Sequence, residues 1–427
     1  MATFNKVWKN PDLKRKIFFT TMIFIVYRIG VFIPVPGVNT EVVRATMQQP
    51  VFGFLDAFTG GALGTFSVFA MSISPYINAS IIVQLLQMDV IPILAEWSKE
   101  GESGKRKINQ VTRYLSLILA FVQALAMAIG FNMMNNGIFL LGQGWLVYLY
   151  IAIVLTAGTA IMLFLSDQIT AKGIGNGTSM IIVAGIVTQI PRMIGDLYSY
   201  YLVNLTIPNI LAVVAIIALI LLTVIGVVYL QLATRKLPIQ YANRHNSAQL
   251  SGRKDSFIPL KLNSAGVIPV IFASTLLSLP LTVINFFPES GFTNVLGILF
   301  DFNNSIIGLL IYIILIVGFT YFYAFVQVSP EKVAENLKKQ GSYIPGVRPG
   351  ADTEEYLSKV LSRITFIGAL SLVVIACLPI VLSMLTEIPQ SIRIGGTTIL
   401  IVVGVAIETA KQVQTKTMDQ RYQGFIK

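Results

Sequence analysis

The residues that could carry out chemistry are few and scattered in this sequence. It has one histidine, His245, and one cysteine, Cys377, so neither a multi-histidine metal site nor an intrachain disulfide can form. No G-x-S-x-G nucleophile motif occurs, and carboxylates are nearly absent from the long apolar stretches. The glycines of residues 173–177 follow no predicted strand, which argues against a dinucleotide site. We therefore predict that the chain is not an enzyme and has no resident metal or cofactor.

The composition indicates a membrane protein. Of the 427 residues, 55% are hydrophobic and 12% are charged, whereas soluble domains carry about 25% charged residues. The apolar residues fall in long runs, and residues 205–232 and 305–328 each exceed the roughly 20 residues that cross a bilayer as a helix. The elements that position any functional side chain should therefore be membrane-spanning α-helices.

We predict an all-α membrane protein with ten such spans. They cover approximately residues 17–33, 67–88, 111–131, 145–165, 178–195, 209–232, 265–286, 305–328, 363–385 and 395–413. The first span follows directly on a basic segment, residues 1–16, without a cleavage site, which favours an uncleaved helix over a signal peptide.

The distribution of basic residues predicts the orientation in the membrane. The net charge is +11, and most Lys and Arg residues lie in the two tails and in the loops after even-numbered spans. Arg44, Arg192 and Arg393 are the exceptions on the opposite side, and Arg28 lies inside the first span near its outer end. This imbalance predicts a cytoplasmic location for both termini. For Arg28 we favour an extended side chain that reaches the membrane surface over a functional role.

Two predicted cytoplasmic loops, residues 231–263 and 329–362, are long, polar and basic. Loops of this length are usually functional or disordered. A positive surface suits an anionic or large macromolecular partner, and it is compatible with a contact to ribosomal RNA.

The segment 54–66 is apolar but too short to cross a membrane. Gly60, Gly61 and Gly64 weaken it as a regular helix. Broken backbone at membrane depth occurs only inside protein or along a water-filled cavity. Two interpretations stay open: a static re-entrant packing element, or a movable stopper in a pore. For the second, we expect the small residues to make few anchoring contacts.

Five motifs, in order along the chain, resemble the SecY family of protein-translocation channels. They are residues 74–82 (SPYINASII), 173–179 (GIGNGTS), 259–263 (PLKLN), 344–350 (IPGVRPG) and 395–403 (GGTTILIVV). The resemblance implies two pseudo-symmetric five-helix halves around a central pore, residues 17–200 and 201–413, with cytoplasmic tails 1–16 and 414–427.

The resemblance also implies a ring of aliphatic side chains at the pore constriction. Position by position, the ring would consist of Ile73, Ile77, Ile182, Ile186, Ile271 and Ile401. The residues alone indicate less than the resemblance does. Ile73 and Ile77 are spaced i, i+4, as are Ile182 and Ile186, so each pair shares a helix face, which ordinary packing residues also do. An apolar ring would exclude water and ions while letting any peptide sequence slide.

The remaining site residues are likewise implied by the resemblance. A plug at 54–66 would include Phe54, Gly60, Gly61, Gly64 and Phe66; a lateral gate between the second and seventh spans would include Ser72, Gln84, Ser274 and Ser278; and the partner-binding loops would present Arg244, Arg253, Lys254 and Arg348. Ordinary interhelical hydrogen bonding and a solvated basic loop explain the last two sets equally well.

The function implied is a passive conduit that passes unfolded preproteins across the cytoplasmic membrane and releases apolar segments sideways into lipid. The partners implied are small membrane subunits similar to SecE and SecG, the SecA ATPase, the ribosome, signal peptides and unfolded preproteins, with membrane lipid around them. The main alternative is a secondary transporter of small solutes, which predicts ionisable residues at the membrane midplane. A scaffold without a conduit is a further alternative.

Overall fold

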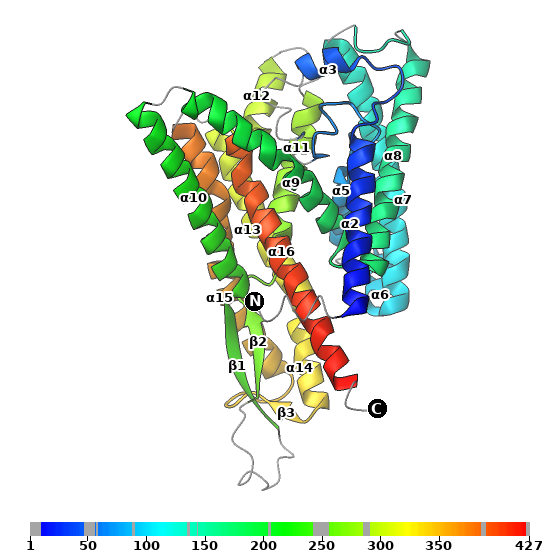
Figure 1. Ribbon diagram of the computed structural model, residues 1–427. Helices are drawn as coiled ribbons and strands as arrows, with labels where there is room; N and C mark the ends of the chain where they lie inside the picture. Colours follow the sequence, from blue (N-terminus) through cyan, green and yellow to red (C-terminus); the bar gives the residue numbers. More distant parts are fainter. Residues whose placement is uncertain are drawn as a thin grey trace.

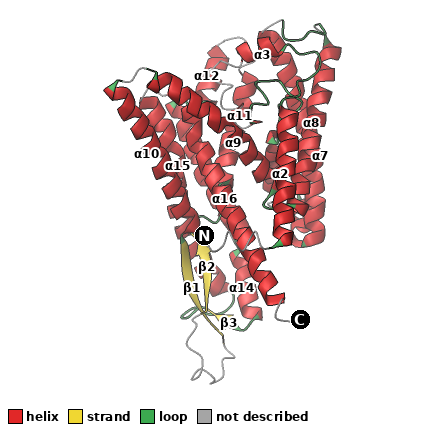
Figure 2. Cartoon of the chain, viewed as in Figure 1, coloured by secondary structure: helices red, strands yellow, loops and turns green. Residues whose placement is uncertain are grey.

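The computed structural model describes residues 10–46, 56, 59–87, 90–134, 137–142, 144–203, 206–241, 256–284, 291–385 and 390–423. Over these residues the chain is mostly helical, and its long helices run side by side along one direction (Figure 1). The described strands gather beyond one end of the helices (Figure 2).

Each predicted span overlaps one long helix. These helices are α2 (Pro11–Val31), α5 (Ser74–Leu86), α7 (Glu102–Met134), α8 (Trp145–Lys172), α9 (Gly177–Leu197, continued by the π-helix η1, Tyr198–Leu202), α10 (Ile207–Leu232), α11 (Ile268–Ile284), α13 (Ile306–Gln327), α15 (Ala351–Leu385) and α16 (Gln390–Gln423). Among the described residues, 6 helices are long and apolar enough to cross a membrane by length and composition. The count of ten spans therefore stays a proposal.

The predicted second span is wrong at its start. Helix α5 begins at Ser74 rather than at residue 67, with Pro75 in its first turn. Proline is favoured there and disfavoured in a helix interior, because it lacks the N–H that would bond one turn back. Immediately before the helix, Ser72 has a positive φ of 48°, so residues 60–73 form successive turns instead of helix.

The long helices fall into two groups by their contacts. In the first, α5 and α8 pack on α7, and α2 and α9 pack on α8; in the second, α13, α15 and α16 pack in series, with α10 on α16 and α11 on α13. The groups meet where α9 contacts α16 and where α5 contacts α11. The α5–α11 contact is called the lateral seam below.

The two long loops, for which the sequence predicted no strands, contain a small β-sheet that the predicted all-α class did not include. Strands β1 (Thr234–Tyr241), β2 (Ser256–Lys261) and β3 (Ser342–Tyr343) form an antiparallel sheet in the order β2-β1-β3. Helix α14 (Pro330–Lys339) and the start of α15 complete the unit. Its buried side chains are Leu237, Leu260, Ala334, Leu337, Ile344, Leu357, Val360 and Ile364.

The two predicted loops pack together because each supplies an apolar surface. The first loop supplies one face of the β1–β2 hairpin, and the second supplies one side of α14. In β1, Leu237 and Ile239 are the more buried residues and alternate with the exposed Lys236, Pro238 and Gln240, the period of a half-buried strand. The register pairs Leu237 with Ile258, so these two side chains lie on one face together with Leu260. That face covers the apolar side of α14.

The described parts of the predicted cytoplasmic segments lie at one end of the bundle. The start of α2, the short helix α6 (Pro92–Lys99), the β1–β2 hairpin, α14 and the end of α16 are at the bottom of Figure 1. Helices α3 (Thr40–Thr46) and α12 (Gly291–Phe300) are at the opposite end. The chain thus presents its basic segments on a single face.

Candidate functional site

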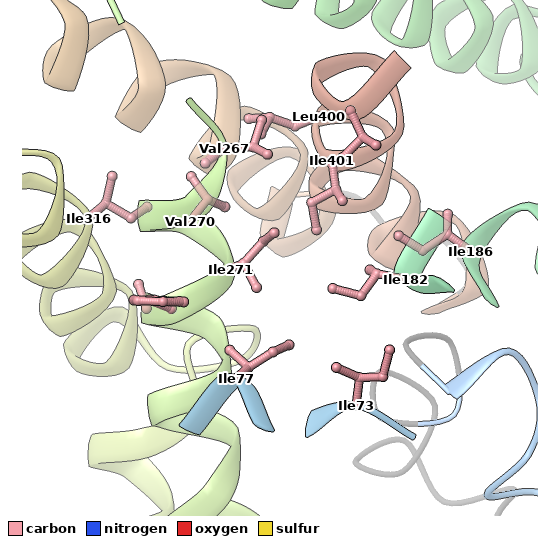
Figure 3. Close-up of a cluster of buried hydrophobic side chains, with 14 of the residues drawn as sticks. Ile73, Ile77, Ile182, Ile186, Val267, Val270, Ile271, Ile316, Leu400 and Ile401 are labelled. Carbon is pink, nitrogen blue, oxygen red and sulfur yellow. The ribbon is translucent and has the colours of Figure 1, made fainter. Parts of the chain in front are cut away.

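Six isoleucines, five from four helices and one from the turn before α5, meet in the middle of the bundle. Ile73 immediately precedes α5 and Ile77 lies in α5, Ile182 and Ile186 lie in α9, Ile271 lies in α11 and Ile401 lies in α16. Their exposed fractions are only 1% to 7%, and all six belong to one buried apolar cluster. Figure 3 shows them approaching a common centre from different helices. We refer to these six residues as the isoleucine collar.

The collar is built across both groups of helices. Spacing of i, i+4 places both members of each pair on one face of the chain, as the sequence predicted. Val267, Val270, Ile316 and Leu400 extend the same cluster (Figure 3). The sequence analysis did not single these out, because an apolar residue within an apolar helix carries no distinguishing local signal. Chemically, the collar offers no hydrogen-bonding group to water or ions.

The described part of the candidate plug at 54–66 lies against α2 and α9. Phe54 is outside the described residues; Asp56 and residues 59–66 are described. Gly60 and Gly61 have positive φ values of 69° and 88°. A Cβ at Gly60 would lie 2.8 Å from Cα of Gly185 in α9, so the close approach of the two backbones requires glycine.

The expectation that this segment makes few anchoring contacts is wrong. The Tyr27 hydroxyl donates to the Thr59 carbonyl at 2.9 Å, and Nη1 of Arg28 donates to the Gly60 carbonyl at 3.0 Å. Oδ1 of Asp56 accepts the N–H of Gly64 at 2.7 Å, while its other oxygen pairs with Arg192. The small residues are compatible with dense polar contacts because Tyr27 and Arg28 of the neighbouring helix α2 bond to backbone carbonyls of the segment, and Asp56 of the segment adds its own side chain.

Arg28 therefore does not simply extend toward the membrane surface, as the sequence favoured. Its guanidinium lies 4.5 Å above the ring centre of Phe32 while it donates to Gly60. Both contacts stabilise the guanidinium cation.

The C-terminal end of the candidate plug is fixed to the segment after α2. The N–H of Val35 donates to the Phe66 carbonyl, and the N–H of Val68 donates to the Ile33 carbonyl, both at 3.0 Å. The Phe66 ring is fully buried and meets Phe131 of α7 edge to face at 5.3 Å. Gly64 and Phe66 thus belong to a structured turn region.

The four predicted lateral-gate residues lie near the seam but bond differently from one another. Ser274 and Ser278 donate to carbonyls of their own helix α11, those of Ile271 and Thr275. Ser72 is buried in the turn before α5. Gln84 makes a bond between the two groups of helices: its Oε1 accepts from the Tyr323 hydroxyl of α13, while its Nε2 donates to Ser80. The sequence did not single out Tyr323.

Among the predicted partner-binding residues, Arg348 is described and is exposed, and its carbonyl accepts from the Thr353 hydroxyl at 2.7 Å. Arg244, Arg253 and Lys254 lie outside the described residues. In helix α14 of the same folded unit, Lys339 forms an i, i+4 pair with Glu335 and lowers the pKa of that carboxyl.

No group of three His, Cys, Asp or Glu side chains that could hold a metal occurs in the described part of the chain. The fold and the site define a class: a helical membrane protein with a central apolar cluster, to which several helices contribute, and a structured non-helical segment beside it.

The chain belongs to the SecY family, because the sequence model of that family matches residues 67–410. It is 49% identical to the protein translocase subunit SecY of Bacillus licheniformis, over 100% of this chain and 99% of the relative. It is 50% identical to the same subunit of Halalkalibacterium halodurans, with the same coverage.

Solved structures share the fold. A protein-conducting channel superimposes with a TM-score of 0.64 and 21% identity, covering 94% of this chain and 92% of that chain. Sec61 in the canine ribosome-channel complex from the endoplasmic reticulum gives a TM-score of 0.64 at 20% identity and the same coverage. A further neighbour, at a TM-score of 0.63 and 19% identity, comes from work on how the plug domain of SecY stabilises the closed channel; it covers 94% of this chain and 92% of that chain.

Proposed function

We propose that this chain is the channel-forming subunit of a protein translocase, which passes unfolded preproteins across the cytoplasmic membrane and releases apolar segments into the bilayer. The observation that carries the proposal is the isoleucine collar, to which both groups of helices contribute. The curated relatives, named as protein translocase subunits, support it over full length.

The proposed channel has ten spans in two five-helix halves, residues 17–200 and 201–413. This is supported by the overlap of each predicted span with one helix and by the two contact groups. Residues 1–16 and 414–427 would be cytoplasmic, as would the β-sheet unit. The clustering of basic segments at one end of the bundle supports that orientation.

The collar is proposed to gate by dewetting. Six aliphatic side chains leave no polar partner for water, so a continuous water column through them is unfavourable. A threaded peptide would be tolerated because the collar makes no sequence-specific hydrogen bonds. The candidate plug would block the path on the outer side of the collar when no chain is present.

Lateral release is proposed to occur through the seam between α5 and α11. A segment of about 20 apolar residues favours the bilayer once it has access to lipid. Of the predicted gate residues, Gln84 links the two helix groups through Tyr323, while Ser274 and Ser278 bond within α11 and Ser72 is buried before α5. These polar groups would set how easily the seam parts.

The partners we propose are small membrane subunits similar to SecE and SecG, the SecA ATPase and the ribosome, with signal peptides and preproteins as clients. The energy would come from a partner, since members of this family are channel subunits and not enzymes. The folded β-sheet unit carrying Arg348 is the proposed docking surface. Similar folds observed on ribosomes support a cytoplasmic partner of that size.

A translocation intermediate tests the proposal against the alternative of a small-solute transporter. An arrested preprotein should crosslink to a photoreactive residue placed at Ile77 or Ile271. Deleting residues 60–65 should raise the ion leak of reconstituted channels. Crosslinks confined to the periphery of the bundle, together with an unchanged leak, would exclude a protein-conducting path.

A further inference from the structure

We infer that a polar latch, closed by the pair Asp56 and Arg192, holds the candidate plug on α2 and α9, and that its release is a step separate from opening the lateral seam. The inference rests on the proposed channel function. It assigns the sealing contacts to particular side chains of one helix group.

Asp56 closes the latch from two directions. Its side chain is 11% exposed, one carboxylate oxygen accepts the N–H of Gly64 at 2.7 Å, and the other lies 3.6 Å from Nη1 of Arg192. The Asp56 carboxylate therefore binds Gly64 within the same segment and also pairs with Arg192 of α9. Because the side chain of Arg192 is 68% exposed, this end of the latch can be altered without disturbing a core.

A second set of contacts holds the backbone of the segment. The carbonyls of Thr59 and Gly60 are adjacent, and they accept hydrogen bonds from Tyr27 and Arg28 of α2. The Thr188 hydroxyl of α9 lies 3.4 Å from the same Gly60 carbonyl. Charged donors make stronger hydrogen bonds than neutral ones, so Arg28 is expected to be the strongest of the three.

Helix α9 links the latch to the collar. Gly185, Thr188 and Arg192 are spaced three and four residues apart and continue the stripe that begins at Ile182. A chain that displaces Ile182 would therefore shift the surface on which the candidate plug rests. This gives a direct physical route from an occupied collar to an unlocked plug.

The latch contacts named above all come from the first helix group. The lateral seam, in contrast, joins α5 of that group to α11 of the other. Separating the groups leaves the contacts of Asp56, Tyr27, Arg28 and Arg192 intact. Breaking the latch should accordingly raise ion leak without changing how readily apolar segments enter the bilayer.

The test uses the complete translocase reconstituted in lipid vesicles. We expect Arg192→Gln and Asp56→Asn each to raise halide leak by up to about fivefold, the range that an ion pair with one exposed partner supports. The double variant should leak no more than the worse single variant. Arg192→Lys should restore much of the seal. Arg44→Gln removes the same charge from an exposed position on the same predicted side of the membrane and serves as the matched control.

A second readout separates the latch from the seam and from misfolding. Membrane insertion of a test segment of graded hydrophobicity should be unchanged in Arg192→Gln. Additive leaks in the double variant, a leak no greater than that of Arg44→Gln, or a shifted insertion threshold would each overturn the inference. If arrested chains still crosslink to Ile77 in that case, the proposed channel function stands and only the latch fails.

Discussion

The replacement of Gly60 by alanine offers a quantitative test of how the candidate plug is seated. Gly60 has a φ of 69°, and a left-handed conformation costs a residue with a Cβ roughly 1–2 kcal/mol. The added methyl would lie 2.7 Å from the Tyr27 hydroxyl and 2.8 Å from Cα of Gly185. Overpacking of this kind costs about 1–3 kcal/mol, which gives roughly 2–5 kcal/mol in total.

This strain exists only while the segment is docked against α9. It should therefore favour the undocked segment, by about 30-fold at the lower end of that range, since about 1.4 kcal/mol corresponds to a factor of ten. The expected result is a large rise in halide leak from vesicles that contain the translocase. The amount of folded complex should be unchanged, because the strain can be relieved by undocking.

Gly61→Ala is the matched control. Gly61 also has a positive φ, 88°, but its added methyl would meet only Nε2 of Gln189, at 3.2 Å. A flexible side chain can move aside, so this variant retains the backbone strain without the backbone clash. We expect an intermediate leak. Equal leaks from Gly60→Ala and Gly61→Ala would refute the close-approach argument, and wild-type leak in both would refute the seal itself.

Three further predictions concern the collar, the seam and the cytoplasmic unit. Ile271→Asn should wet the collar and raise ion conductance several-fold in channels that already lack residues 60–65; conductance equal to that of the deletion alone would contradict dewetting. Tyr323→Phe leaves Oε1 of Gln84 without its hydroxyl donor, at a net cost of about 0.5–1.5 kcal/mol, and should lower the hydrophobicity needed for membrane insertion of a test segment. Leu260→Asp buries a carboxylate in the sheet unit, where Leu260 is 4% exposed; proteolysis between residues 234 and 261 should accelerate while leak stays at the wild-type level.

Much of the helical framework could be predicted from composition and periodicity. Membrane insertion demands about 20 apolar residues per span, and this requirement is visible in a single sequence wherever a span is long. Prediction from apolar length fails where the backbone is not helical inside the protein, as in residues 60–73. There, neighbouring side chains such as Tyr27 and Arg28 bond to the backbone carbonyls that a helix would have paired. The sequence analysis also missed the strands β1 and β2, because their alternating pattern is short and lies within basic loops.

Part of the candidate site could likewise be predicted from the sequence, and part could not. The collar isoleucines could be located through the resemblance to the SecY family, and their i, i+4 spacing fixed which ones share a helix face. Nothing local distinguished them from lipid-facing isoleucines, which have the same chemistry. The polar contacts of Asp56 with Arg192 and of Gln84 with Tyr323 link residues more than a hundred positions apart, and no local pattern encodes such partners.

The sequence by itself determined the class of protein and predicted the side of the membrane for each loop, because transfer of apolar and charged groups into lipid depends on residue type alone. It also lacks the catalytic motifs sought, which are read directly from the residues. Only the tertiary structure decided that Arg28 binds the re-entrant segment, that Gly60 is required by a neighbouring helix, and that two distant loops share one sheet. Those outcomes depend on which surfaces meet, and contact between surfaces is set by the packing of the whole chain.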